Sequence, residues 1–547
     1  MTRIPTREAP AVHAVRGWTL VSTGGVADVE VTAADDAPLG DVIPSLGRQL
    51  GVELAGLWAG TTRLGDDTPL TAPELAHGAV LGAGRPAPRR SAGIRSSALE
   101  LHVVGGPDAG RTVPLGQGRS VLGRGSEATV RLDDPDVSRR HVAVQVGSGK
   151  ITVADLSSTN GSRLDGLDLD EHPVNWPAGA VLRVGASAVR IAGPGGAAAA
   201  LEPASGGRIR LRPSRFPTTP RPQVEISFPR PPEPPPRRRP AWGGTWLADR
   251  RPRRADVAAH ALELLAAQYS LADAVRAGVR ALEAASPDLA TLTAAARRRC
   301  SPLWSRTRRS ADALTVRLGS GPGSVGVTRI EPDGSRRAES APHVPSVVDL
   351  RTSGGLAVVG PRERGVGVLR GVLTQLTALH APGEVDVVLL PGTNRLADWA
   401  WARWLPHLDE RAAQPDDEAL HTWLTGAIAD RRAGWDAGAR PGWLVVVVDR
   451  PLGPRLAAIL RETRDVGIVT LTAAESVEDL PVAVDAVLRL TGETGETGEL
   501  GVLGGPATPC VKDVVVDRLP HSVAAQFARD LAALVPASSV PAWPGPR

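Results

Sequence analysis

The first part of the chain alternates apolar and polar residues in the manner of short β-strands. Residues 18–21 and 26–31 alternate with a period of two, and Gly24-Gly25 between them is a hairpin signal. An amphipathic segment follows at residues 39–50, and short strands are predicted twice more before residue 82. A hairpin, a helix and then further strands is the order of a β-grasp domain.

Residues 99–193 alternate more regularly. Leu101 and Val103 are expected on one face of a strand, and Glu100 and His102 on the other. Glycine-containing turns recur about one strand apart, which predicts an all-β sandwich.

The middle of the chain carries two different patterns. Residues 196–254 show little periodicity and are rich in Pro and Arg, which predicts a linker with polyproline II structure at 231–236. Residues 255–284 place apolar side chains at three- and four-residue intervals, which predicts a helix.

The last third alternates buried strands with helices. The strands expected at 356–359, 385–390 and 444–448 are almost entirely apolar, which favours a parallel, doubly wound sheet covered on both faces. The Gly-Glu-Thr repeat at 492–499 is expected to be a solvated loop.

The expected fold class is therefore multidomain. The predicted parts are a disordered tail at 1–14, a ubiquitin-like β-grasp domain at 15–86, a sandwich at 99–193, a Pro/Arg-rich linker at 196–254, a connector of helix and strand at 255–344, and an α/β domain at 345–536.

Composition adds little to this division. The 547 residues suffice for several cores, and a net charge of +4 gives no nucleic-acid signature. The two cysteines, Cys300 and Cys510, are far apart and lack neighbouring residues at metal-ligand spacing, so a reducing compartment is the simplest interpretation. We expect no signal peptide, no spanning helix and no metal site.

Three short polar motifs stand out inside the predicted sandwich: Gly123-Arg124, Ser138-Arg139-Arg140-His141 and Ser158-Thr159-Asn160-Gly161. A phosphothreonine carries about two negative charges and three acceptor oxygens. Arg124 offers a bidentate guanidinium, Ser138 a hydroxyl and Arg139 a second cation. Gly161 permits the turn that follows Asn160. The motifs predict a site that reads a phosphorylated peptide.

This segment resembles the forkhead-associated (FHA) domain, which binds phosphothreonine, over essentially its whole length. The resemblance implies that Thr159 also touches the phosphate and that Asn160 bonds the peptide main chain. It further implies that His141 holds the Ser138 loop through hydrogen bonds, and that Gly123 and Gly161 support the site.

A degenerate P-loop follows the strand that ends at Val359. Gly360 and Gly365 have the P-loop spacing, but Val366 and Gly367 stand where a lysine and a hydroxyl belong. These changes remove the cation on the β/γ-phosphates and a magnesium ligand, so ATP hydrolysis is not expected. Weak anion binding by helix N-terminal amides at 365–367 stays open.

Asp449 ends a strand in the manner of a Walker B motif. Arg450 stands where a catalytic carboxylate belongs, so the simpler interpretation is that Asp449 only ends the strand. We expect no enzymatic activity and no cofactor.

This half resembles the first, degenerate ATPase-like domain of the FtsK/SpoIIIE-type ATPases of type VII secretion systems, through residues 354–364 and 398–407. That family has two membrane helices after its Pro/Arg run, where this chain has a short stub at 240–254. The family also continues into active ATPase domains, whereas this sequence ends at Arg547. The resemblance therefore implies a truncated relative without membrane helices.

Together these features predict a phosphothreonine-peptide-binding adaptor or regulator linked to a type VII secretion or FtsK/SpoIIIE-like system. The expected partner is a threonine-phosphorylated protein or peptide, and a secretion ATPase or another type VII component is a second candidate. The expected location is the cytoplasm, free or peripheral at a membrane secretion complex. The alternative is a fragment or paralogue of a secretion ATPase or DNA translocase that binds nucleotide.

Two further hypotheses come from the linker. Arg237–Arg239 and Arg250–Arg254 could bind nucleic acid, but solvated charge runs are commoner, so we expect no specific nucleic-acid partner. Thr218 and Thr219, when phosphorylated, could occupy the chain's own FHA-like site.

Overall fold

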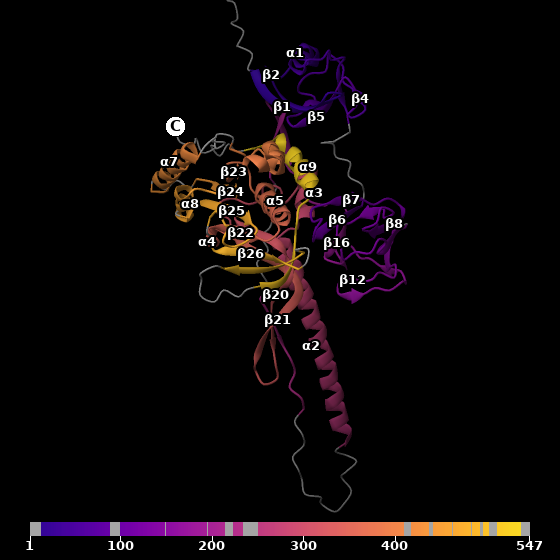
Figure 1. Cartoon of the computed structure of the whole chain (residues 1–547). Helices are drawn as coiled ribbons and strands as arrows, with labels where there is room; N and C mark the ends of the chain where they lie inside the picture. The colour runs from indigo at the N-terminus through magenta and orange to yellow at the C-terminus, as the bar shows by residue number, and fades with distance from the viewer. Residues whose placement is uncertain are drawn as a thin grey trace, which may run out of the picture.

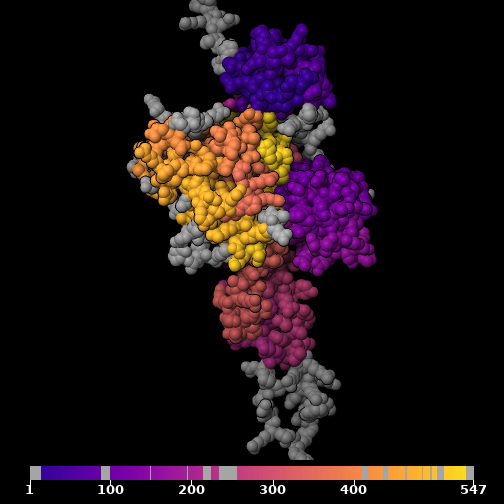
Figure 2. All heavy atoms as spheres, in the orientation of Figure 1, coloured from indigo at the N-terminus to yellow at the C-terminus, as the bar shows by residue number. Residues whose placement is uncertain are grey.

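The computed structural model describes residues 13–537 except 88–98, 148, 194, 214–222, 233–249, 410–416, 437–440, 462, 483, 493–495 and 503–510. An N-terminal module (residues 13–87) lies at one end of a C-terminal core (residues 289–537), and the sandwich (residues 99–193) lies against its side (Figures 1 and 2). A long helix and a hairpin project from the core at the opposite end from the N-terminal module.

The N-terminal module is a five-stranded sheet packed against one helix. The strand order is β2-β1-β5-β3-β4, with β1 parallel to β5 and the other pairs antiparallel. Trp18 and Leu20 from β1 and Leu46 from α1 form its buried core. The bounds are β1 (His13–Ser22), β2 (Gly25–Ala34), α1 (Ile43–Leu50), β3 (Leu57–Ala59), β4 (Thr62–Arg63) and β5 (Ala79–Ala83).

The all-β sandwich predicted for residues 99–193 is confirmed. One sheet has the order β14-β11-β10-β8-β9 and the other β13-β12-β15-β16-β6-β7. The bounds are β6 (Glu100–Gly105), β7 (Thr112–Pro114), β8 (Gly118–Gly123), β9 (Val130–Arg131), β10 (Val142–Val146), β11 (Ile151–Asp155), β12 (Ser162–Leu164), β13 (Leu167–Asp168), β14 (Val174–Asn175), β15 (Val181–Val184) and β16 (Ser187–Ala192).

The polar face of β6, which carries Glu100 and His102, is buried as well as its apolar face. Glu100 and His102 are only 2% and 3% exposed because helix α3 (Leu289–Arg298) of the core packs over them. Arg297 of α3 donates to both carboxylate oxygens of Glu100 at 2.9 Å. Burial alone would raise the pKa of Glu100, but hydrogen bonding from His102 and the nearby arginines lower it to about 2. The sandwich is thus docked by ion pairs.

The core contains the predicted parallel sheet and extends it. Strands β23, β24, β25, β22 and β26 are mutually parallel, and β27, β28 and β20 continue the same sheet antiparallel. Helix α5 supplies much of the apolar cluster beneath it. The bounds are β20 (Thr315–Ile330), β21 (Arg336–Asp349), α4 (Leu350–Ser353), β22 (Gly355–Val359), α5 (Arg362–Leu379), β23 (Val385–Pro391), α6 (Leu396–Trp399), α7 (Asp417–Asp436), β24 (Trp443–Asp449), α8 (Pro454–Arg461), β25 (Ile468–Ala474), β26 (Ala486–Thr491), β27 (Thr497–Val502), β28 (Val511–Val516) and α9 (His521–Ala532).

The predicted linker at 196–254 is partly wrong. Strands β17 (Ala200–Ala204) and β18 (Arg208–Arg212) form a hairpin that pairs with β29 (Leu534–Pro536), and β19 (Val224–Ser227) pairs with β20. These strands are stabilised by partners distant in sequence, which local composition does not reveal. Most of the proline run, Thr218, Thr219 and Arg237–Arg239 lie outside the described residues.

The predicted helix at 255–284 is confirmed as α2 (Arg250–Ala285). Only the second half of the helix buries its apolar stripe, where Leu271, Val275 and Val279 pack on β20 and β21. In the first half, Val257 is 54% exposed. No helix in the described ranges combines the length and apolar character needed to cross a membrane.

Three predicted boundaries are also corrected. Strand β1 begins at His13, inside the tail predicted at 1–14. The limit placed between residues 344 and 345 falls within β21, which joins the two regions in one sheet. In the repeat at 492–499, expected to be a solvated loop, Glu496 is 8% exposed and β27 begins at Thr497.

Candidate functional site

The three polar motifs of the sandwich meet at the ends of its strands. Gly123 ends β8 and Arg124 follows it, Ser138 to His141 precede β10, and Ser158 to Gly161 join β11 to β12. The Thr159 amide donates to Ser138 Oγ at 3.1 Å, and the two hydroxyl oxygens lie 3.4 Å apart. Two loops separated by about one hairpin therefore place two hydroxyl groups side by side.

His141 connects these two loops through hydrogen bonds. Its side chain is completely buried, its Nδ1 accepts the Ser138 amide at 2.9 Å, and its Nε2 lies 3.2 Å from the Gly161 carbonyl oxygen. With Nδ1 accepting, Nε2 carries the proton and donates to that carbonyl. This agrees with the supporting role expected for His141.

The two glycines are required for different reasons. A Cβ at Gly123 would lie 2.1 Å from the Arg139 carbonyl oxygen, so only glycine allows the strand to approach the Ser138 loop. Gly161 has a φ of 72°, in the left-handed region that glycine adopts without strain.

Both candidate cations are exposed beside these hydroxyls. The Arg124 amide donates to the Ser138 carbonyl at 3.0 Å, which fixes its backbone next to the loop. Arg124 and Arg139 are exposed, and among the described residues no hydrogen bond or ion pair holds their side chains. Such guanidinium groups can turn toward an incoming phosphate without breaking an existing ion pair.

Asn160 is turned toward a neighbouring loop. Its Nδ2 donates to the Asp136 carbonyl at 2.9 Å, so its amide oxygen stays available to a main-chain N–H of a ligand.

Asp155 is a supporting residue that the sequence reasoning missed. It is buried at the end of β11, and its Oδ1 and Oδ2 accept the Ser158 amide and hydroxyl, each at 2.7 Å. Burial opposes the ionised form, but hydrogen bonds from Ser162 and Ser158 lower the pKa of Asp155. The signal was an aspartate three residues before a serine at a strand end, a common turn pattern.

The predicted P-loop is not a loop. Helix α5 begins at Arg362, and the Gly365 amide already donates to the Pro361 carbonyl at 3.1 Å. Gly365, Val366 and Gly367 are buried inside the helix, so their amides do not form the weak N-terminal anion site that the sequence left open. Gly360 follows β22 with its amide bonded to the Ala474 carbonyl at 3.0 Å.

Asp449 does more than end a strand, contrary to the simpler interpretation. It is 1% exposed and accepts hydrogen bonds from Arg362 at 2.7 Å, Arg395 at 2.8 Å and the Trp399 indole at 2.9 Å. Arg362 also pairs with Asp398 at 2.8 Å. The guanidinium of Arg362 therefore spans the region between the start of α5 and the end of β24.

Comparisons with known proteins identify relatives of parts of the chain. Residues 102–194 match a family described as the cytoplasmic domain of an inner membrane component of type III secretion systems. The FHA domain-containing protein FhaA of Mycobacterium tuberculosis is 37% identical over 83 residues, which is 15% of either chain. A solved FhaA FHA domain, complexed with the intracellular domain of Rv3910, is 34% identical with a TM-score of 0.16 and matches 17% of this chain and 99% of that one.

The chain is also similar to proteins of type VII secretion systems. The ESX secretion system protein EccC of Thermomonospora curvata is 28% identical over 122 residues, covering 19% of this chain. EccC of Geobacillus thermodenitrificans is 24% identical over 225 residues, covering 35% of this chain. The chain spans only 9% and 15% of the lengths of these two relatives.

Proposed function

We propose that this chain is a phosphothreonine-dependent adaptor. The supporting observation is the grouping of the Ser138 and Thr159 hydroxyls beside Arg124, whose side chain no described residue holds, on loops held by a buried histidine. Arg124 and Ser138 are assigned to the phosphate with Thr159, Arg139 supplies a second cation, and Asn160 bonds the peptide main chain. Similarity to an FHA domain-containing protein supports this assignment.

Peptide titration of the full chain tests this proposal. A phosphothreonine peptide should bind, and its unphosphorylated form should not. Arg124→Ala should weaken binding about tenfold or more, because one charge-assisted hydrogen bond contributes roughly 1.5–3 kcal/mol. Arg119→Ala is the matched control, since Arg119 is an exposed arginine at the other end of β8. Equal losses in both variants would contradict the assignment.

We further propose that the core is a docking scaffold without ATPase activity. Arg362 at the start of α5 pairs with Asp449, the residue in the Walker B position, and Val366 and Gly367 lie buried within a helix. Purified chain should show neither magnesium-dependent ATP turnover nor saturable binding of a fluorescent ATP analogue. Turnover that disappears in Asp449→Asn would overturn this proposal and favour the nucleotide-binding alternative.

The similarity to EccC supports a role at a type VII secretion system. We assign the N-terminal module to the β-grasp fold from its strand order and single packed helix. We place the chain in the cytoplasm, free or peripheral at the secretion complex, with the secretion ATPase or another type VII component as partner of the core. Co-purification of tagged chain with secretion components, compared between wild type and Arg124→Ala, would separate docking by the core from phosphopeptide binding.

A further inference from the structure

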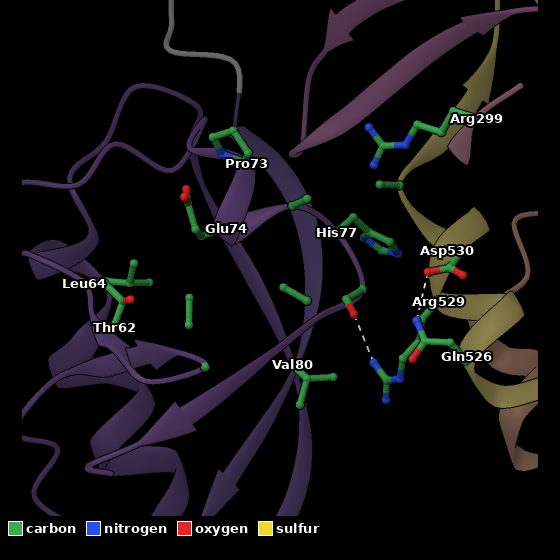
Figure 3. A pocket seen from close by; sticks show the side chains of 16 residues that line it. Thr62, Leu64, Pro73, Glu74, His77, Val80, Arg299, Gln526, Arg529 and Asp530 are labelled. Carbon is green, nitrogen blue, oxygen red and sulfur yellow. Dashed lines mark hydrogen bonds between the residues drawn. The ribbon is translucent and has the colours of Figure 1, made fainter. Parts of the chain in front are cut away.

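A cavity of about 280 Å³ lies between the N-terminal module and the core. Figure 3 shows Leu64 and Thr62 on the module side and Arg299 and Asp530 on the core side. The module contributes mostly apolar surface together with Glu74 and His77, and the core contributes Arg299, Arg529 and Asp530. A chamber with apolar walls and a few converging polar groups is the usual form of a small-molecule site.

Contacts made by Arg529 hold the two walls of the cavity together. Arg529 of α9 donates to the Gly78 carbonyl at 3.0 Å and to Thr19 Oγ1 at 2.8 Å, both in the N-terminal module. Its guanidinium also lies 4.5 Å from the ring centre of Trp404. The cavity is therefore bounded by two bodies in fixed contact.

Arg299 lines this space together with Arg529, whose guanidinium is already engaged by Gly78 and Thr19. Arg299 caps the C-terminal end of α3 with a φ of 52°, a conformation in which glycine is the residue that costs least. No hydrogen bond or ion pair among the described residues holds its guanidinium. Burial lowers the pKa of Arg299, and the charge of Asp530 opposes this shift. A half-buried guanidinium without an acceptor is a ready partner for an anion.

Asp530 does not neutralise Arg299 fully. It is 8% exposed, and its Oδ1 accepts Gln526 Nε2 at 2.8 Å. Burial raises the pKa of Asp530 to about 7, so about half of the molecules carry a neutral Asp530 at that pH. Burial, with Arg208 and Arg16 nearby, lowers the pKa of His77 to about 4 and keeps that ring neutral. Glu74 is exposed at the module rim, where water screens it.

We propose that this cavity binds a carboxylate carried on a short apolar body, with Arg299 as the partner of the carboxylate and the module's apolar wall around the body. A protonated Asp530 can donate a second hydrogen bond to the same carboxylate. Two sources have this chemistry: a free short-chain fatty acid, and a peptide whose last residue is apolar.

The test uses hexanoate, hexanamide and two tetrapeptides ending in leucine, one with a free carboxylate and one amidated. Binding to the full chain is measured by calorimetry and by ligand-observed NMR. We expect saturable binding of hexanoate or of the free-carboxylate peptide, and none of either amide. The arm that binds identifies the source. The absence of saturable binding by both carboxylates at millimolar concentration would overturn the proposal.

Variants assign the binding to Arg299. Arg299→Gln should weaken carboxylate binding about tenfold or more, and Arg299→Lys should keep part of it. Asp530→Asn should bind at least as tightly as wild type at pH 8, because it removes a negative charge while keeping a donor. The far-ultraviolet circular dichroism spectrum and the melting temperature, measured on the same samples, report that the variants are folded. Carboxylate binding unchanged in a folded Arg299→Gln would refute the site.

Discussion

At the residue scale, His141 joins the two loops that carry the predicted phosphate ligands. It is fully buried and bridges the Ser138 amide and the Gly161 carbonyl. His141→Ala leaves both groups without their partner, which costs about 1–3 kcal/mol for each buried group left unsatisfied. We expect a lower melting temperature and weaker phosphopeptide binding together, measured by calorimetry on one sample.

An exposed histidine provides the control for the effect of burial at His141. His172 is an exposed histidine of the same sandwich, whose ring pairs with Asp170 at 3.2 Å. His172→Ala should leave both melting and peptide affinity near wild type. If His141→Ala behaved in the same way, the loops would be held by something else.

Local sequence predicted that these loops lie together because each motif carries its own turn chemistry. Gly123, Ser138, His141 and Gly161 lie together as expected, since turn residues and a buried histidine impose local geometry. Asp155 was missed because aspartate at a strand end is common and its burial depends on neighbouring loops. The burial of Glu100 could not be foreseen, because Arg297 lies almost two hundred residues away in the sequence.

At the element scale, the start of α5 and the end of β24 are joined by one buried carboxylate. Asp449→Ala would leave Arg362 and Arg395 without their buried partner. Removing one member of a buried ion pair typically costs about 3–5 kcal/mol, and partial exposure of both arginines reduces this to roughly 2–3 kcal/mol. We expect that loss in the denaturant unfolding of the core.

Asp417→Ala is the matched control, because it breaks an exposed pair with Arg450 that adjoins the same strand. A surface pair contributes about 0–1 kcal/mol. Equal unfolding midpoints for the two variants would show that Asp449 contributes no more to the stability of the core than an exposed ion pair does.

Elements with strong periodicity were predicted from sequence, and those that depend on distant partners were not. Helix α2 and strands β22 to β25 carry their patterns locally. Strand β18 alternates arginine with apolar residues inside a Pro/Arg-rich stretch, and it pairs with β29 more than three hundred residues later. The P-loop expectation failed at the start of α5, because Pro361 begins the helix earlier than the motif requires.

At the scale of the whole molecule, Glu100 and Arg190 attach the sandwich to α3 and its N-cap residue through ion pairs. Glu100 pairs with both Arg297 and Arg298, and Arg190 pairs with Asp288 at 2.7 Å. The double variant Glu100→Ala, Arg190→Ala should loosen this docking and enlarge the radius of gyration in small-angle scattering. Phosphopeptide affinity should stay unchanged, because the loops lie at the strand ends. Arg163→Ala, which breaks an exposed pair with Asp168, should change neither quantity.

The core should lose stability in mild acid. Burial lowers the pKa of His380 to about 4 and that of His407 to about 3, below the ordinary value of 6.5. The unfolded chain therefore binds more protons than the folded one as the pH falls below 6.5. Stability should drop by roughly 1 kcal/mol per pH unit for each histidine between pH 6.5 and 4. Urea unfolding at pH 7.5, 6 and 5 measures this, and a flat profile would contradict it.

The most direct test of the central proposal is the affinity of the full chain for one threonine peptide, chosen from a phosphothreonine library, in its phosphorylated and unphosphorylated forms. We predict that the phosphorylated form binds about a hundredfold more tightly, because several charge-assisted hydrogen bonds depend on the phosphate. Equal affinity for the two forms, or a failure of the library to yield any binding peptide, would contradict a phosphothreonine-reading function.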